Sequence, residues 1–140
     1  MSDILALFSG GGGSVSTDIK TRVMGVALDY GAVIPTGIVP GGDIYCPFAC
    51  TITAATLLSQ SGAGSIVFDI WKAAFGAFPP TVANTIVAAA KPTLAAAQSS
   101  QDTTLVGWTT SIAAGDVLRF NVDSATTLTS VVLALTVVLT

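Results

Sequence analysis

The sequence of 140 residues contains no histidine and no glutamate, and only 9% of its residues are charged. The missing histidine excludes the Ser-His-Asp and Cys-His arrangements of nucleophilic catalysis. Acid–base chemistry would fall to aspartate, but Asp69 and Asp116 stand far apart in the sequence, each beside an expected strand. A turn or a solvated outer position accounts for each more simply than a pair of catalytic carboxylates. The sequence therefore predicts that the protein is not an enzyme.

Cysteine is also scarce, since Cys46 and Cys50 are the only two. A zinc site needs further ligands, and no histidine or third cysteine is present to supply them. In an extended segment four residues span roughly 13 Å, about twice the Cα separation that a disulfide tolerates. We therefore expect two small buried hydrophobic side chains, and we predict no metal and no cofactor.

The low charge also limits the partners of the chain. Its formal net charge is −3, and nucleic-acid binding, which needs clustered Lys and Arg, is not expected. The best candidate for a membrane span, the uncharged stretch 124–140, is rich in Val and Thr and favours a strand, so we expect no membrane association. The N-terminus lacks the positive leading region of a signal peptide, so we expect synthesis in the cytoplasm.

Hydrophobic residues make up 51% of the chain, and its polar residues are mostly Thr and Ser. Apolar runs recur about every ten residues with turn residues between them, which is typical of an all-β sandwich. The pattern predicts strands at 19–28, 44–58, 65–72, 103–108, 117–122 and 130–140. It also predicts one short helix at 81–90, with Thr81 as its N-cap.

The first thirteen residues differ from the rest of the chain. Ile4, Leu5, Leu7 and Phe8 form an apolar segment, and Gly10–Gly13 follow as a joint. We therefore divide the chain into an N-terminal arm with its glycine joint (1–13) and a β-sandwich domain (14–140). The four apolar side chains of the arm are the predicted contacts to a neighbouring subunit.

The last predicted strand is apolar on both faces. One face carries the side chains of residues 131, 133, 135, 137 and 139, and the other carries those of Val132, Ala134, Thr136 and Val138. A strand that is apolar on both faces is buried on both faces, whereas the outer face of a single sandwich meets water. The second set therefore predicts an oligomer interface, and a weakly charged surface is consistent with an assembling protein.

Trp71 and Trp108 are candidate surface aromatics for stacking on sugar rings. No cluster of carboxylates or amides accompanies either residue in the sequence. Packing in the core or at a subunit interface is therefore the favoured interpretation of both.

Six linked segments resemble a domain found in many tailed-phage virion proteins. They are Cys-Pro-Phe-Ala-Cys-Thr-Ile-Thr (46–53), Gly-Ser-Ile-Val-Phe-Asp-Ile-Trp-Lys (64–72), Phe-Pro-Pro-Thr-Val-Ala (78–83), Lys-Pro-Thr-Leu (91–94), Gln-Asp-Thr-Thr-Leu-Val-Gly-Trp (101–108) and Gly-Asp-Val-Leu-Arg-Phe-Asn-Val-Asp-Ser (115–124). The resemblance covers 42–140 and implies a jelly-roll-like antiparallel β-sandwich that forms homotrimers on the virion surface.

A domain of this kind with so short a segment before it resembles a capsid decoration, or cement, protein. The resemblance implies a trimer on the capsid surface of the virion, made in the host cytoplasm, that clamps neighbouring major capsid protein subunits. The alternative is a tail or fibre-tip protein that binds a host surface glycan. The sequence leaves both locations open.

Overall fold

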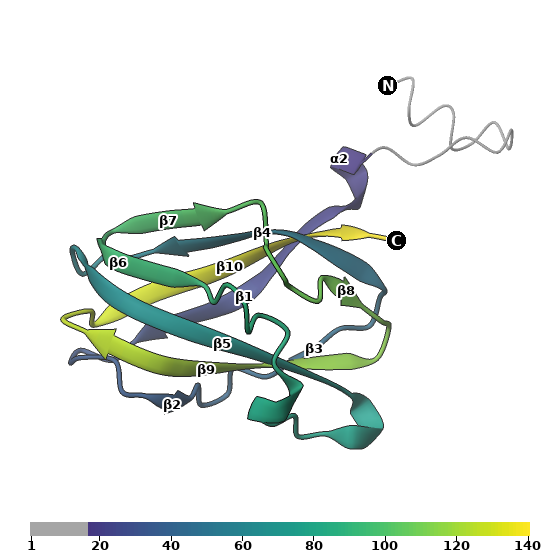
Figure 1. Ribbon diagram of the computed structural model, residues 1–140, viewed down its shortest axis with the longest axis horizontal. Helices are drawn as coiled ribbons and strands as arrows, with labels where there is room; N and C mark the ends of the chain where they lie inside the picture. The colour runs from purple at the N-terminus through teal and green to yellow at the C-terminus, as the bar shows by residue number, and fades with distance from the viewer. Residues whose placement is uncertain (1–16) are drawn as a thin grey trace, which may run out of the picture.

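The computed structural model describes residues 17–140, which form two antiparallel sheets packed face to face (Figure 1). Sheet A has the strand order β1 (Thr21–Asp29), β10 (Ser130–Leu139), β4 (Cys50–Leu58) and β7 (Ser99–Asp102), and β8 (Ser111–Ile112) also pairs with β4. Sheet B has the order β2 (Gly37–Ile38), β9 (Asp116–Thr126), β5 (Gly64–Ala74) and β6 (Thr93–Ala97), and β3 (Ile44–Tyr45) also pairs with β9. The all-β sandwich expected from the sequence is confirmed, while its jelly-roll class stays a prediction.

The core lies between the inner faces of the two sheets. Alternate residues of β5 and β9, such as Phe68 and Phe120, are fully buried and face the alternate residues Leu133 and Leu135 of β10. This alternation follows from the two-residue period of a strand, which sends successive side chains to opposite faces. The strand predictions near 65–72 and 117–122 rested on the same period, and the structure confirms them together with the strand predicted near 130–140.

The helical elements are short. α2 (Thr17–Lys20) precedes β1, and two 3₁₀ turns, η1 (Phe75–Ala77) and η2 (Val82–Asn84), follow β5. The predicted helix at 81–90 is therefore wrong beyond its first turn, where the Thr81 N–H donates to the Asn84 side chain. Ile86 instead donates its N–H to the Ile70 carbonyl and becomes buried, because pairing with β5 covers an apolar side chain that a helix would leave exposed.

The predicted strand at 103–108 is also wrong, because the strand in this region lies earlier, at β7. The Asp102 carboxylate accepts the N–H groups of Thr104 and Leu105, and Leu105 adopts a φ of 50°. An aspartate that accepts from the residues just after it forms a local turn, which ends a strand. The predicted arm (1–13) and residues 14–16 lie outside the described residues.

Candidate association surfaces

Within residues 17–140, the outer face of β1, β10 and β4 carries one charged side chain, that of Asp29 at the end of β1. The register places Val23 opposite Thr136, Ala134 opposite Thr56, and Val132 between Ala27 and Leu58. We call this surface the sheet A face and define it by Val23, Ala27, Ala54, Thr56, Leu58, Val132, Ala134, Thr136 and Val138. Val23 is 68% exposed, Leu58 50% and Val132 41%, which is unusual for large aliphatic side chains on a solvated sheet.

All four residues of the predicted oligomer interface, Val132, Ala134, Thr136 and Val138, lie on the sheet A face. Their neighbours in sequence at 131, 133, 135 and 137 are at most 2% exposed and belong to the core. The sequence therefore identified correctly which side of β10 faces away from the core. That a second copy covers this side stays a prediction.

A close approach of two backbones interrupts the sheet A face at Gly25. A Cβ atom at this position would lie 1.9 Å from the Leu133 carbonyl oxygen and 3.0 Å from the Ala134 Cα. Only glycine fits here, because backbone atoms cannot yield as a flexible side chain can. A hollow of about 220 Å³ lies over this point, between β1 and β10.

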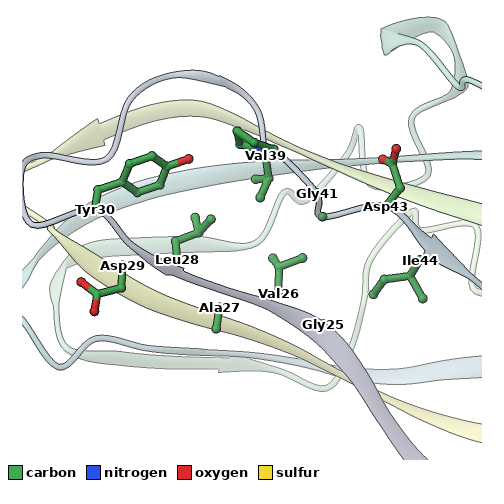
Figure 2. Close-up of a pocket in the computed structure, with 12 residues that line it drawn as sticks. Gly25, Val26, Ala27, Leu28, Asp29, Tyr30, Val39, Gly41, Asp43 and Ile44 are labelled. Atoms are coloured by element: carbon green, nitrogen blue, oxygen red, sulfur yellow. The ribbon is translucent and has the colours of Figure 1, made fainter.

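A groove of about 450 Å³ runs along the edge of β1 that lies opposite β10 (Figure 2). One wall is β1 from Gly25 to Asp29 with Tyr30, and the other is the loop from Val39 to Ile44 that joins β2 to β3. Figure 2 shows Val26 and Leu28 pointing from β1 toward this loop, while Ala27 and Asp29 point away. The groove is thus the opening between the two sheets at their free edges, and its floor includes the apolar side chains of Val26, Leu28 and Val39.

The loop leaves the groove open because it cannot continue the edge of sheet B. β2 and β3 contribute two residues each to this edge, and between them the Gly42 N–H closes a turn onto the Val39 carbonyl. Gly41 within this turn has a φ of 67°, a conformation that L residues with side chains rarely adopt. Within residues 17–140, sheet B therefore has no full-length strand opposite β1.

The edge of β1 itself is open in the described part of the chain, where β1 pairs with β10 alone. Natural edge strands are usually protected by lysine, proline or a bulge. Residues 23–28 contain no charge and no proline, and the β1–β10 register is continuous from Thr21 to Asp29. The sequence analysis missed this edge, because neither the short partner strands nor the loop beside it gives a local signal.

The two tryptophans do not form the sugar platform considered from the sequence. Trp71 is only 8% exposed, bridges to Thr85, and finds no acceptor for its Nε1 within residues 17–140. Trp108 is half-buried against the core and donates its Nε1 hydrogen to the Ala90 carbonyl at 2.6 Å. The segment after β5 covers Trp71, so it is not a surface aromatic, and both residues serve packing.

Other aromatic side chains are exposed instead. Tyr45 and Phe75 meet edge to face with their ring centroids 6.1 Å apart, and Phe75 is 70% exposed. Phe78 is 47% exposed and lies 5.2 Å from the guanidinium of Arg119, which also makes two hydrogen bonds to Asp43. We call these three rings the aromatic cluster. The sequence analysis did not identify it, since its members come from β3, from η1 and from the residue after η1.

The two aspartates considered as catalytic residues are engaged in structural contacts. Asp69 is 1% exposed, which corrects the solvated position expected for it, and it accepts hydrogen bonds from the Ile70 N–H and the Thr85 hydroxyl. Lys91 lies 3.3 Å from Asp69 and 2.6 Å from Asp123. The hydrogen bond to Asp123 and the charge of Asp69 raise the Lys91 pKa. Asp116 accepts the Ala113 N–H and so forms a turn, as expected.

Cys46 and Cys50 are both free and 1% exposed, as the sequence predicted. Burial raises the pKa of the Cys46 thiol to about 11, with smaller contributions from Cys50 and Asp116. A neutral buried thiol is a poor nucleophile and a poor metal ligand.

Residues 17–140 hold no group of His, Cys, Asp or Glu side chains arranged to bind a metal. The same residues include no helix that is long and apolar enough to cross a bilayer. Comparisons of the chain with protein-family models, with curated proteins and with solved structures find no match. The surfaces described above therefore carry the functional argument.

Proposed function

We propose that this protein is a structural component of a phage virion, a homotrimeric capsid decoration protein that stabilises the shell by clamping neighbouring major capsid subunits. The observation that carries the proposal is the sheet A face, an uncharged and largely aliphatic surface on the outside of a sandwich. The resemblance of 42–140 to virion domains supports the threefold state and the virion location.

The physical case for self-association rests on the exposed side chains of the sheet A face. Full burial of a Val or Leu side chain contributes about 1.5–3 kcal/mol, and these residues are already partly buried in the single chain. Val23, Leu58 and Val132 together therefore offer several kcal/mol per contact, against which the loss of translational freedom must be set. Symmetry repeats this contact around a closed ring, so a modest patch suffices for a stable oligomer.

Besides the sheet A face, the arm provides a second contact to neighbouring subunits. Ile4, Leu5, Leu7 and Phe8 provide an apolar segment at the end of a glycine joint, which lets it reach past the edge of its own domain. Burial of these side chains on a neighbouring subunit ties the copies of the decoration layer across the boundaries between capsid subunits. The capsid subunits would then be held through contacts that repeat over the whole shell.

Substitution of Val132 by aspartate tests the self-association. Val132 is 41% exposed, so Val132→Asp leaves the core intact but places an unpaired carboxylate in each copy of the interface. We expect the association constant to fall by at least about tenfold per contact, or about 1.4 kcal/mol. Sedimentation velocity of the purified protein measures this change.

The matched control is Val106→Asp, which changes a side chain that is 65% exposed in a loop away from the sheet A face. This variant should sediment as the parent does. A parent protein that is monomeric at all concentrations, or an oligomer unaffected by Val132→Asp, would contradict the role of this face.

A second candidate function, a tail or fibre-tip protein that binds host glycan, is favoured by the aromatic cluster alone. The exposed Tyr45–Phe75 pair offers ring faces for sugar C–H groups, and the Arg119–Asp43 pair beside Phe78 offers partners for hydroxyl groups. If this function is correct, the protein binds a printed array of microbial glycans and Phe75→Ala loses that binding. Tyr30→Ala, which changes an exposed ring outside the cluster, should retain it.

A further inference from the structure

We infer that the groove beside β1 is a receptor for an added strand, and that its occupant is the apolar segment Ile4–Phe8 of a second copy of this chain. The inference rests on the proposed function, which brings copies side by side, and it names the partner of the arm. Three features of the protein support it: the free edge of β1, the shape of the groove, and the length and composition of the chain before Thr17.

The first feature is the edge of β1, whose backbone groups on the side away from β10 are available to pair with a further strand. Alternate N–H and C=O groups of a strand point to either side, and over residues 23–28 the only partner strand within residues 17–140 is β10. An extended peptide laid along the other side would satisfy these groups with a regular ladder. The uncharged run 23–28 contains nothing that repels such a peptide.

The groove selects an apolar strand. Every second side chain of a strand added beside β1 would point into the opening between the sheets, as Val26 and Leu28 do in Figure 2. The floor there is formed by Leu28 and Val39, which are 6% and 5% exposed, together with the partly buried Ile44. Among residues 17–140, the charged residues that line the groove are the acidic Asp29 and Asp43, so an uncharged segment fits it better than an acidic one.

The segment Ile4–Phe8 has the matching size and pattern. Five residues in a strand extend for about 17 Å, and the β1 wall from Gly25 to Tyr30 extends for about 20 Å. With a two-residue period, Leu5 and Leu7 would enter the groove together, or Ile4 and Phe8 with Ala6 between them. Either set is wholly apolar.

The start of the described chain favours a neighbouring copy as the receptor. Figure 1 shows α2 beyond the end of sheet A, near the C-terminus, whereas the groove lies along the later half of β1. Hydrogen bonds from the Arg22 guanidinium to the carbonyls of Ile19 and Thr21 fix this junction. The sixteen residues before Thr17 can reach up to about 50 Å from it. The arm therefore has enough length to reach the groove of a neighbouring copy that self-association brings alongside.

Hydrogen–deuterium exchange of the full-length protein, measured at high and at low concentration, tests the edge of β1. We expect the alternate amides of residues 23–28 that face away from β10 to exchange at least about tenfold more slowly at high concentration. The double variant Leu5→Asp with Leu7→Asp should remove this protection. Val15→Asp, which places a single negative charge outside the apolar segment, should leave it in place.

Photo-crosslinking identifies the copy that receives the arm. Light and heavy Phe8→benzoylphenylalanine proteins are unfolded and refolded together as an equal mixture before irradiation, and cross-links to residues 25–44 are read by mass spectrometry. We expect links between light and heavy chains. Links only within one isotope would show that the arm covers its own β1, and no link to these residues would show that the groove has another occupant, so either result overturns the inference.

Different results would refute the proposed function and the proposed occupant of the groove. An oligomer that Val132→Asp dissociates, but whose β1 edge exchanges freely at every concentration, would leave the proposed function standing and remove the arm from the groove. A protein that is monomeric throughout would remove the self-association on which both proposals rest.

Discussion

At the scale of single residues, Gly25 decides how closely β1 approaches β10. A side chain there would collide with the backbone of Leu133 and Ala134, and backbone atoms of a paired strand have no other place to go. The same close approach brings β1 into position to form one wall of the groove and one margin of the sheet A face. This one glycine therefore supports both association surfaces.

Gly25→Ala should destabilise the protein by about 1–3 kcal/mol, since forcing a methyl group into a filled site displaces the β1 backbone. Urea unfolding followed by tryptophan fluorescence measures the change in the free energy of unfolding. Gly76→Ala is the control, because a Cβ there meets nothing within 4 Å. A Gly25→Ala protein as stable as the control would show that β1 is not held as closely as described.

At the scale of elements, the central strands were predictable from the sequence and the connections were not. β5 and β9 place apolar residues at every second position, at 66, 68 and 70 and at 118, 120 and 122, and β10 is rich in Val and Thr on both faces, so each favours a strand. The segments 81–90 and 103–108 contain short apolar runs, for which helix, strand and turn are hard to separate. Their structure was decided by distant partners, as when Ile86 pairs with Ile70.

The contrast between local patterns and distant partners also explains which site residues were predictable. The interface residues of β10 follow from one strand read alone, so their face was correctly assigned. Packing was the favoured interpretation of Trp71, but the sequence does not show what covers it, because that segment arrives fourteen residues later, at Thr85. The groove and the aromatic cluster each join parts of the chain that no local pattern connects, namely β1 with the loop Val39–Ile44, and Tyr45 with Phe75.

At the scale of the whole molecule, the composition predicts an unusual dependence of stability on pH. The chain lacks histidine and glutamate, so apart from its terminal amine no group with an ordinary pKa titrates between about pH 5 and pH 8. Below this range, a hydrogen bond from Arg119 lowers the pKa of Asp43 from its ordinary value of 3.8. Hydrogen bonds from the N–H groups of Leu105 and Thr104 lower the pKa of Asp102 from the same value. Above it, burial raises the pKa of Cys46 from 9.0 to about 11.

The free energy of unfolding should therefore be constant between about pH 5 and pH 8 and fall on either side. The stabilisation from the two aspartates is present above their unfolded value of 3.8 and is lost as the pH falls through their lowered folded values. The stabilisation linked to the Cys46 thiol is present below 9.0 and is lost as the pH rises toward about 11. Urea unfolding from acid to alkaline pH tests this, and a change above about 1 kcal/mol between pH 5 and pH 8 would contradict it.

The central claim is that many copies of this protein cover a phage shell and hold its subunits together. Quantitative mass spectrometry of purified particles, which gives the number of copies per major capsid subunit, tests it most directly. The account predicts a ratio of about one or a simple fraction of it, since a decoration layer follows the symmetry of the shell. A ratio of roughly a few per hundred would place the protein at a tail or a vertex and contradict the claim, because so few copies cannot follow that symmetry.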